Sequence, residues 1–375
     1  MRYVRRAWAL VSLPILSIFL AVVVGSLVIL VAELLVGGNL RLELPLRAYA
    51  ALLSGSVGSP NALINSLVQA TPLLLGGLSV GFAFKAGLFN IGAQGQFLIG
   101  ALTTVAVGVQ FRTFEPGFVG MLVAITAGTL AGAAYGAIPG ILKAVSGAHE
   151  VVTTIMLNFV AVSTVAALVS TVFNVPGSPS PITFSVGNAE LPVIIGRNGH
   201  LGILIAPLIA IGYGFLLFRT TWGFEIRTVG ANPEAARYAG MSPRLVVVVA
   251  MAVAGGLAGL AGATELLGVT HHMTASYGTT VGFDSIAVAL LGRTNPLGIM
   301  LAALLFGGMR AGAGAMQIQA GVPAELVGVL QATILFFIVA SVLVRRVFRL
   351  RVAGPGLDEA TTITRTYGGE APRTA

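Results

Sequence analysis

The sequence predicts an all-α polytopic membrane protein with about ten transmembrane helices. Of its 375 residues, 56% are hydrophobic and only 9% are charged, whereas soluble domains carry about 25% charged residues. The 49 glycines suit helices that pack closely within a membrane. Apolar runs long enough to cross a bilayer recur along almost the whole chain.

Ten apolar segments account for the predicted spans. In order, they are residues 7–32, 61–84, 86–111, 117–142, 151–173, 201–218, 245–268, 282–292, 297–314 and 322–344. The eighth segment is short for a full crossing, so we interpret it as a short or broken span. Residues 37–60 are predicted to form a polar loop, and residues 174–200 an external loop rich in Pro, Gly and Ser.

The basic residues predict that both chain ends are cytoplasmic. Arginines precede the first span and follow the last, and with ten spans most of the 21 Lys and Arg residues fall on the same side. The first apolar run is too long for a signal-peptide core and is predicted to remain as a span. Arg310, near the end of the ninth span, falls on the opposite side and is expected to pair or snorkel.

The chain divides into an N-terminal transmembrane helix (1–36), a transmembrane domain (37–345) and a polar tail (346–375) that is predicted to be disordered. Two similar halves are predicted within the domain, at about 60–173 and 245–344. Each half holds a segment that is predicted to be a broken helix with polar residues. The segment is FKAGLFNIGAQGQF in the first half and YGTTVGFDSIAVALLGRTNP in the second.

Amide and hydroxyl side chains gather at two places in the first half. Asn90, Gln94 and Gln96 lie in or beside the third span, within GLFNIGAQGQFLIG, and Thr154 and Asn158 share one helical face in HEVVTTIMLNF. Buried amides need hydrogen-bond partners. Two interpretations stand: hydrogen bonds between helices, or a pore-lining face that binds neutral polar groups.

Asp284 is one of the few acids near an apolar run. A charge inside a bilayer is costly unless it is paired or hydrated. Asp284 is therefore either a structural or substrate-facing anion at a broken helix, or an interfacial cap that accepts from the amides of Ile286 or Ala287.

The longest well-charged stretch between the termini is residues 219–244, RTTWGFEIRTVGANPEAARYAGMSPR. Asn232 is a suitable N-cap, Pro233 suits the first helical position, and Glu234 lies in the first turn, where the helix dipole favours an anion. Gly240 can end the helix in a left-handed conformation. The stretch predicts a short helix over residues 233–239 that serves as a handle for a partner protein.

Several kinds of chemistry are excluded or disfavoured. The chain has no cysteine, no Walker loop, no H-E-x-x-H and no basic stripe with interleaved aromatics, so no catalytic, metal, cofactor or nucleic-acid site is predicted. Gly77–Gly81 matches G-x-S-x-G, the pattern of a hydrolase. However, it lies inside a span and no histidine is predicted to face Ser79, which favours helix packing.

Four segments resemble the membrane permease subunits of bacterial ABC importers in the ribose and branched-chain amino-acid permease superfamily. LFNIGAQGQFLIGA (88–101) and EVVTTIMLNFVA (150–161) are similar to the nucleoside or simple-sugar branch, and GANPEAARYAGM (230–241) to the coupling segment of that branch. GFDSIAVALLGRTNPLG (282–298) is similar to a second-half signature shared with sugar permeases. The resemblance covers roughly residues 55–345.

This resemblance implies a second permease subunit, giving a heterodimer, an ABC ATPase, an external solute-binding lipoprotein, and a location in the bacterial plasma (inner) membrane. It implies ATPase coupling by Gly230, Asn232, Pro233, Glu234, Ala235, Arg237, Tyr238 and Gly240. The substrate pathway is expected at Phe89, Asn90, Gln94, Gln96, Thr154, Asn158, Phe283 and Asp284.

The expected function is nucleoside import by alternating access, because a pore with amides and few charges suits a neutral polar solute and phenylalanine offers a face to a nucleobase. A simple sugar or a branched-chain amino acid is the alternative substrate. An ion-coupled secondary transporter, with Asp284 as its ionisable group, and an intramembrane hydrolase using Ser79 are the alternative mechanisms.

Overall fold

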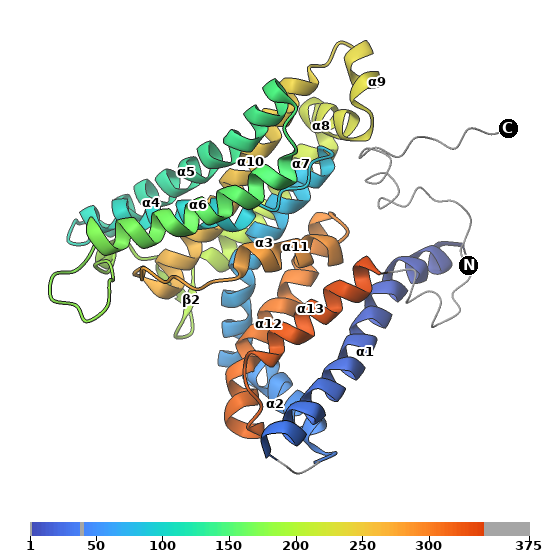
Figure 1. Ribbon diagram of the computed structural model, residues 1–375, viewed down its shortest axis with the longest axis vertical. Coiled ribbons are helices and arrows are strands. Elements are labelled where there is room, and N and C mark those ends of the chain that lie inside the picture. The colour runs from blue at the N-terminus through green and yellow to red at the C-terminus, as the bar shows by residue number, and fades with distance from the viewer. Residues whose placement is uncertain (1, 38–40, 341–375) are drawn as a thin grey trace.

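In the computed structural model, which describes residues 2–37 and 41–340, most of the chain is helical (Figure 1). In chain order the helices are α1 (Arg2–Gly37), α2 (Leu44–Val57), α3 (Pro60–Lys85), α4 (Ala93–Gly108), η1 (Val109–Phe111), α5 (Gly117–Ser146), α6 (Glu150–Thr171), η2 (Gly187–Ala189), α7 (Gly202–Arg219), α8 (Thr221–Ala231), α9 (Pro233–Tyr238), α10 (Pro243–Glu265), the π-helix η3 (Leu266–Thr270), α11 (Val281–Leu291), α12 (Pro296–Ala320) and α13 (Leu326–Val339). Two short strands, β1 (Val193–Ile195) and β2 (Gly199–His200), pair antiparallel between α6 and α7. The predicted all-α class is confirmed.

Seven helices of the described chain are long and apolar enough to cross a membrane: α1, α3, α5, α6, α7, α12 and the continuous α10–η3. The other three predicted spans contain shorter helices, α4, α11 and α13, of 16, 11 and 14 residues. The eighth span was expected to be short, and α11 confirms this. The tail that was predicted to be disordered lies outside the described residues.

The prediction of a polar loop over residues 37–60 is wrong, because most of this range forms α2. Its charged residues suggested a loop, but Arg41 and Glu43 precede the helix and Arg47 lies on its exposed side, while Leu44 and Leu52 are buried. Gly312 of α12 lies directly against the Leu52 backbone. The apolar side of α2 is therefore covered by another helix.

The third predicted span also begins later than expected, at Ala93 instead of residue 86. The intervening residues 86–92 form a helix break. Gly87 adopts a left-handed φ of +72°, and a Cβ there would lie 2.9 Å from the Gly230 carbonyl oxygen of α8. Glycine is needed at this position for both the backbone conformation and the close approach.

The most extensive contact between helices of the described chain is that of α5 with α10, and glycines lie at its centre. The two helices touch backbone to backbone, so that a Cβ on Gly132 would lie 2.5 Å from the Gly255 carbonyl oxygen and 2.7 Å from the Gly259 Cα. Gly136 is equally close to α10. Small residues allow this approach in membranes, where van der Waals packing and not hydrophobic burial drives association.

Helix α3 is the most buried of the seven long helices and packs against α7, α10, α11 and α12. Ser79 of the G-x-S-x-G match lies fully buried inside this helix. Its hydroxyl donates to the Ala254 carbonyl oxygen of α10, at 2.6 Å. Gly77–Gly81 is therefore a helix-packing motif, and the arrangement does not support the hydrolase alternative.

Replacing Gly132 by alanine is expected to destabilise the protein by about 1–3 kcal/mol, because the added methyl group collides with the α10 backbone. Gly212 on α7 is the matched control: among the described residues no atom lies within 4 Å of a Cβ built there. Thermal unfolding in detergent should show a lower midpoint for Gly132→Ala and an unchanged or higher one for Gly212→Ala. Equal midpoints would contradict the assigned packing.

Candidate functional site

Two helix breaks, one before α4 and one before α11, meet inside the bundle through a single side chain. Gln94, at the start of α4, donates from Nε2 to the Thr279 carbonyl oxygen at 2.8 Å, and its Oε1 accepts from the Gly282 N–H at 2.9 Å. The side chain is buried. The predicted polar elements of the two halves are therefore in direct contact, and Gln94 satisfies backbone groups that no regular helix would pair.

Asn158 of α6 likewise pairs with backbone groups at the first break, the one before α4. Its Oδ1 accepts from the Gly95 N–H at 2.8 Å, and its Nδ2 donates to the Ile91 carbonyl oxygen at 3.0 Å. Thr154, one turn earlier, is fully buried and donates its hydroxyl to the Glu150 carbonyl oxygen. Asn158 therefore holds α6 against the break, as the interpretation of hydrogen bonds between helices requires, whereas Thr154 packs against Gly92 of the break and bonds only within α6.

Asn90 and Gln96 bind each other. Two reciprocal hydrogen bonds, of 2.8 and 3.1 Å, join their amide groups, and both side chains are buried. Phe89 packs edge-on against Phe84 with 5.0 Å between ring centroids. Among the expected pathway residues, these three therefore serve the packing of the break.

A cavity of about 440 Å³ lies between α4, α6, residues 275–279 and Phe283. Among the predicted residues it brings together Gln94, Asn158 and Phe283. The complete lining is Gln94, Leu98, Ile155, Asn158, Phe159, Val162, Val165, Ala275, Ser276, Tyr277, Gly278, Thr279 and Phe283. An apolar lining with a few polar groups is typical of small-molecule sites.

Sequence reasoning missed two aromatic residues of this cavity, Phe159 and Tyr277. Each stands next to a polar stretch that had been singled out, since Phe159 follows Asn158 and Tyr277 begins YGTTVGFD. Phe159 is 65% exposed and Phe283 is 46% exposed, so both rings are accessible at the cavity. Their positions beside the conspicuous amides were the available signal.

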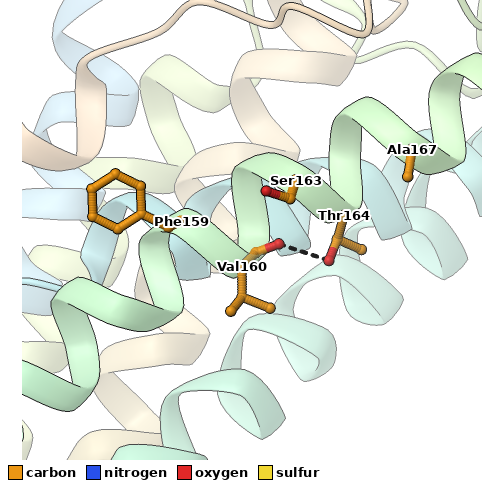
Figure 2. A pocket seen from close by; sticks show the side chains of 5 residues that line it. All are labelled: Phe159, Val160, Ser163, Thr164 and Ala167. Atoms are coloured by element: carbon orange, nitrogen blue, oxygen red, sulfur yellow. Dashed lines mark hydrogen bonds between the residues drawn. The ribbon is translucent and has the colours of Figure 1, made fainter.

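Figure 2 shows a second hollow, which is lined by α6 alone. Its residues are Phe159, Val160, Ser163, Thr164 and Ala167, and Thr164 donates its hydroxyl to the Val160 carbonyl oxygen at 2.7 Å. Because a single helix lines it, this hollow is an open helix surface. The cavity between α4, α6 and α11 is the better candidate for a ligand site.

Asp284 neither caps α11 nor lines the cavity. It lies in the first turn of α11 and forms an ion pair with Arg310 of α12. Thr280 donates to the same carboxylate oxygen at 3.0 Å and accepts from Arg310 at 2.9 Å. Of the alternatives for Asp284, the structure supports the structural anion, and the expectation that Arg310 pairs is confirmed.

The segment predicted to be external folds over the far end of α10. His200 of β2 is buried against Gly268 of η3, and its Nδ1 accepts from the Gly202 N–H at 3.1 Å. This burial, with a smaller contribution from the charge of His271, lowers the pKa of His200 to about 4. His200 is therefore neutral at physiological pH.

The short helix predicted over residues 233–239 is confirmed as α9. Asn232 caps it by accepting from the Ala235 N–H at 3.0 Å, Pro233 and Glu234 occupy its first turn, and Gly240 follows with φ +81°. Helix α8 precedes it and was not predicted; the Thr220 side chain caps α8 by accepting from Gly223.

Helix α9 projects from one end of the molecule (Figure 1). Only Ala236 of its six residues is buried, and Tyr238 is 93% exposed. Glu234 and Arg237 face solvent 3.5 Å apart. Gly230 of α8 packs on the backbone of residues 85–87, which ties this exposed helix to the end of α3.

The chain matches known permeases over most of its length. Residues 62–339 match the family described as "Branched-chain amino acid transport system / permease component". The guanosine ABC transporter permease protein NupP of Bacillus subtilis is 38% identical, over 88% of this chain and 94% of its own. The nucleoside ABC transporter permease protein NupB of Lactococcus lactis is 33% identical, over 88% and 90%.

A glucose ABC transporter permease protein of Haloferax volcanii, TsgB13, is also 33% identical, over 92% of this chain and 91% of its own. A more distant match is NupQ, a second guanosine ABC transporter permease protein of Bacillus subtilis, at 28% over 64% of this chain. No solved structure matches. The chain belongs to the family of permease components of the branched-chain amino acid transport system.

Proposed function

We propose that this protein is the membrane permease subunit of an ATP-driven importer that carries nucleosides across the bacterial plasma membrane. The observation that carries the proposal is the similarity to NupP and NupB, which extends over 88% of this chain in both cases. The cavity suits a neutral solute with an aromatic face. The similarity to TsgB13 keeps a simple sugar as the alternative substrate.

An ion-coupled mechanism is less well supported. Asp284 was its candidate ionisable group, but this carboxylate is occupied by Arg310 and Thr280 and lies outside the cavity. A carrier that exchanges protons or sodium ions needs an ionisable group on the pathway. The proposal therefore assigns the energy to a separate ATPase.

The ATPase is proposed to bind α9 and its flanking residues. A helix that is almost fully exposed contributes little to the fold, yet its capping residues Asn232, Pro233 and Gly240 fix its geometry. Tyr238, Glu234 and Arg237 offer an aromatic anchor and two charges to a partner. Ala235 is exposed beside them, and Gly230 of the preceding helix α8 packs on the backbone at the end of α3.

A second permease subunit and an external solute-binding lipoprotein complete the proposed importer. Bacillus subtilis has two guanosine ABC transporter permease proteins, NupP and NupQ, and both are similar to this chain. This supports a pair of different permeases. Within this chain, the helix breaks before α4 and α11 support two similar halves that rock to alternate access.

The substrate pathway is proposed to include the cavity, and the expected residues have two different roles in it. Phe283 presents its ring to the nucleobase, and Gln94 and Asn158 form the polar wall. The remaining expected residues support this wall from outside the cavity; they are Phe89, Asn90, Gln96, Thr154 and Asp284.

Nucleoside uptake by cells that carry the complete importer is expected to stop when ATP is depleted and to survive a protonophore. ATP depletion removes the proposed energy source, whereas the protonophore removes only the ion gradient. Uptake of radiolabelled guanosine measures the response to ATP depletion and to the protonophore. The substrate is identified separately, by testing which nucleosides and sugars stabilise the purified binding protein against thermal unfolding. Uptake that follows the ion gradient would contradict the proposal.

The double variant Glu234→Arg/Arg237→Glu is expected to lower uptake by about tenfold or more, since reversing both charges of a docking surface creates like-charge contacts with the ATPase. Both residues are exposed, so the permease should fold normally. The matched control is Glu43→Arg/Arg47→Glu, another exposed ion pair. Uptake and ATP hydrolysis in proteoliposomes test it, and unchanged uptake would argue against docking at α9.

Phe283→Ala is expected to raise the nucleoside concentration for half-maximal uptake by about tenfold, because base stacking on an aromatic ring contributes roughly 1–3 kcal/mol. Phe283→Trp should preserve the stacking surface. Phe118→Ala on α5, which removes a phenylalanine that is 61% exposed and outside the cavity, is the control. If Phe283→Ala and Phe118→Ala reached half-maximal uptake at the same nucleoside concentration, Phe283 would not belong to the substrate pathway.

A further inference from the structure

The polar groups that line the cavity are not equally free to bind a ligand. Five of the lining residues carry a polar side chain: Gln94, Asn158, Ser276, Tyr277 and Thr279. Gln94 and Asn158 are only 4% and 6% exposed, and in each the amide oxygen and one N–H group already pair with the backbone of a helix break. An amide that is held in this way has little hydrogen-bonding capacity left for a solute.

The hydroxyl groups of Tyr277 and Thr279 are also engaged within the protein. The Tyr277 hydroxyl lies 3.4 Å from that of Thr270, and the Thr279 hydroxyl accepts from the Val281 N–H at 3.3 Å, at the start of α11. Ser276 differs from both. It is exposed at the cavity, and within the described residues its hydroxyl has no hydrogen-bond partner. Ser276 therefore offers a polar side chain that is free to bind a solute.

The backbone beside Ser276 adds further free groups. Gly278 also lines the cavity and is exposed, and the N–H groups of Ser276 and Gly278 have no acceptor among the described residues. A peptide N–H within a membrane domain needs a partner, which lipid cannot supply. Water or a bound solute must therefore satisfy these two donors. We call residues 276–278 the free edge of the cavity.

Both ends of the free edge are fixed. Before it, Ala275 donates its N–H to the Pro181 carbonyl oxygen at 3.1 Å, so the segment that was predicted to be external holds this end. After it, the Thr279 carbonyl oxygen accepts from Gln94 at 2.8 Å. Three residues between two such anchors have little freedom to move, and binding groups that are fixed in advance lose little entropy when a ligand binds.

The remaining lining is apolar and includes the accessible rings of Phe159 and Phe283. The free polar groups are therefore concentrated in one short segment of an otherwise apolar cavity. A ligand with one hydroxyl-rich part and one flat apolar part fits this division. The hydroxyl groups of a sugar ring both donate and accept, which matches a serine hydroxyl beside two peptide N–H groups.

We propose that the free edge binds the hydroxyl groups of the sugar part of the solute, and that Ser276 is a specificity-determining residue of the cavity. The Ser276 hydroxyl pairs with one sugar hydroxyl, and the neighbouring N–H groups donate to sugar oxygens. This inference rests on the proposed transport function, with the cavity as its substrate site. It applies to a nucleoside and to a simple sugar alike, because both carry ring hydroxyls, and it excludes a solute without them.

Uptake of guanosine by the complete importer is compared with uptake of its deoxy analogues, each of which lacks one ribose hydroxyl. Ser276→Ala should lower guanosine uptake at limiting concentration by roughly three- to tenfold, the size of one neutral hydrogen bond. For the analogue that lacks the paired hydroxyl, the same substitution should have no effect, because the hydrogen bond is already absent. The binding protein is the same throughout, so its own preference cancels when the two permeases are compared.

Two further serine variants separate binding from packing. Ser276→Thr keeps the hydroxyl and should keep most of the discrimination between guanosine and that analogue. Ser163→Ala is the matched control, because Ser163 is exposed on the open surface of α6 (Figure 2), outside the cavity, and its hydroxyl also has no partner in the described chain. This control should leave the uptake of every analogue unchanged.

The absence of cysteine from the sequence allows a second test that needs no transport. In the assembled importer, Ser276→Cys should react with a maleimide, because Ser276 is exposed at the cavity. Ser79→Cys, at a fully buried position, should remain unlabelled and is the control. Mass spectrometry of this chain measures the labelling of both variants.

Three results would overturn the inference: unchanged guanosine uptake in Ser276→Ala, an equal loss for guanosine and all its deoxy analogues, or a Ser276→Cys variant that the maleimide does not label. Failure of the unmodified importer to take up guanosine counts instead against the nucleoside assignment. The comparison is then made with the simple sugar that stabilises the binding protein and with its deoxy analogues. Transport of a solute without hydroxyl groups would overturn the inference and the nucleoside assignment together.

Discussion

The structure depends on one constraint: backbone N–H and C=O groups at membrane depth need partners within the protein, because lipid supplies none. Regular helices meet this requirement by themselves, but the chain is broken before α4 and before α11. At these breaks Gln94 and Asn158 supply the missing donors and acceptors. The irregular backbone that lines the cavity can exist because these two amides complete its hydrogen bonds.

Helix α10 runs from the exposed end of the molecule, beside α9, toward the cavity. Helix α10 begins shortly after α9 and ends at Glu265, immediately before η3, and residues 275–279 beyond η3 line the cavity. Along its length it lies against α3, α4 and α5. A displacement of α9 by a bound partner would pass through the short turn at residues 239–242 into α10, a continuous and mostly buried helix that leads toward the cavity.

Much of this organisation was predictable from the sequence, because it follows from local patterns. Apolar length located the spans, and the capping residues Asn232, Pro233 and Gly240 located α9 to within one residue. The unpredicted features depend on contacts between distant parts of the chain. The apolar side of α2 is buried only because α12 packs against it. Gln94 faces the cavity and Gln96 pairs with Asn90, and this difference depends on the positions of α11 and α6. No spacing rule contains that information.

The contact between α5 and α10 has a mechanical consequence. At its centre Gly132 and Gly136 of α5 face Gly255 and Gly259 of α10 backbone to backbone, while the side chain of Met251 packs beside Gly140. Few side chains would therefore have to pass one another if the two helices slid, as in shear motions between packed helices. Contacts at the two ends of α10, beside α9 and beside η3, would then determine where the helix comes to rest.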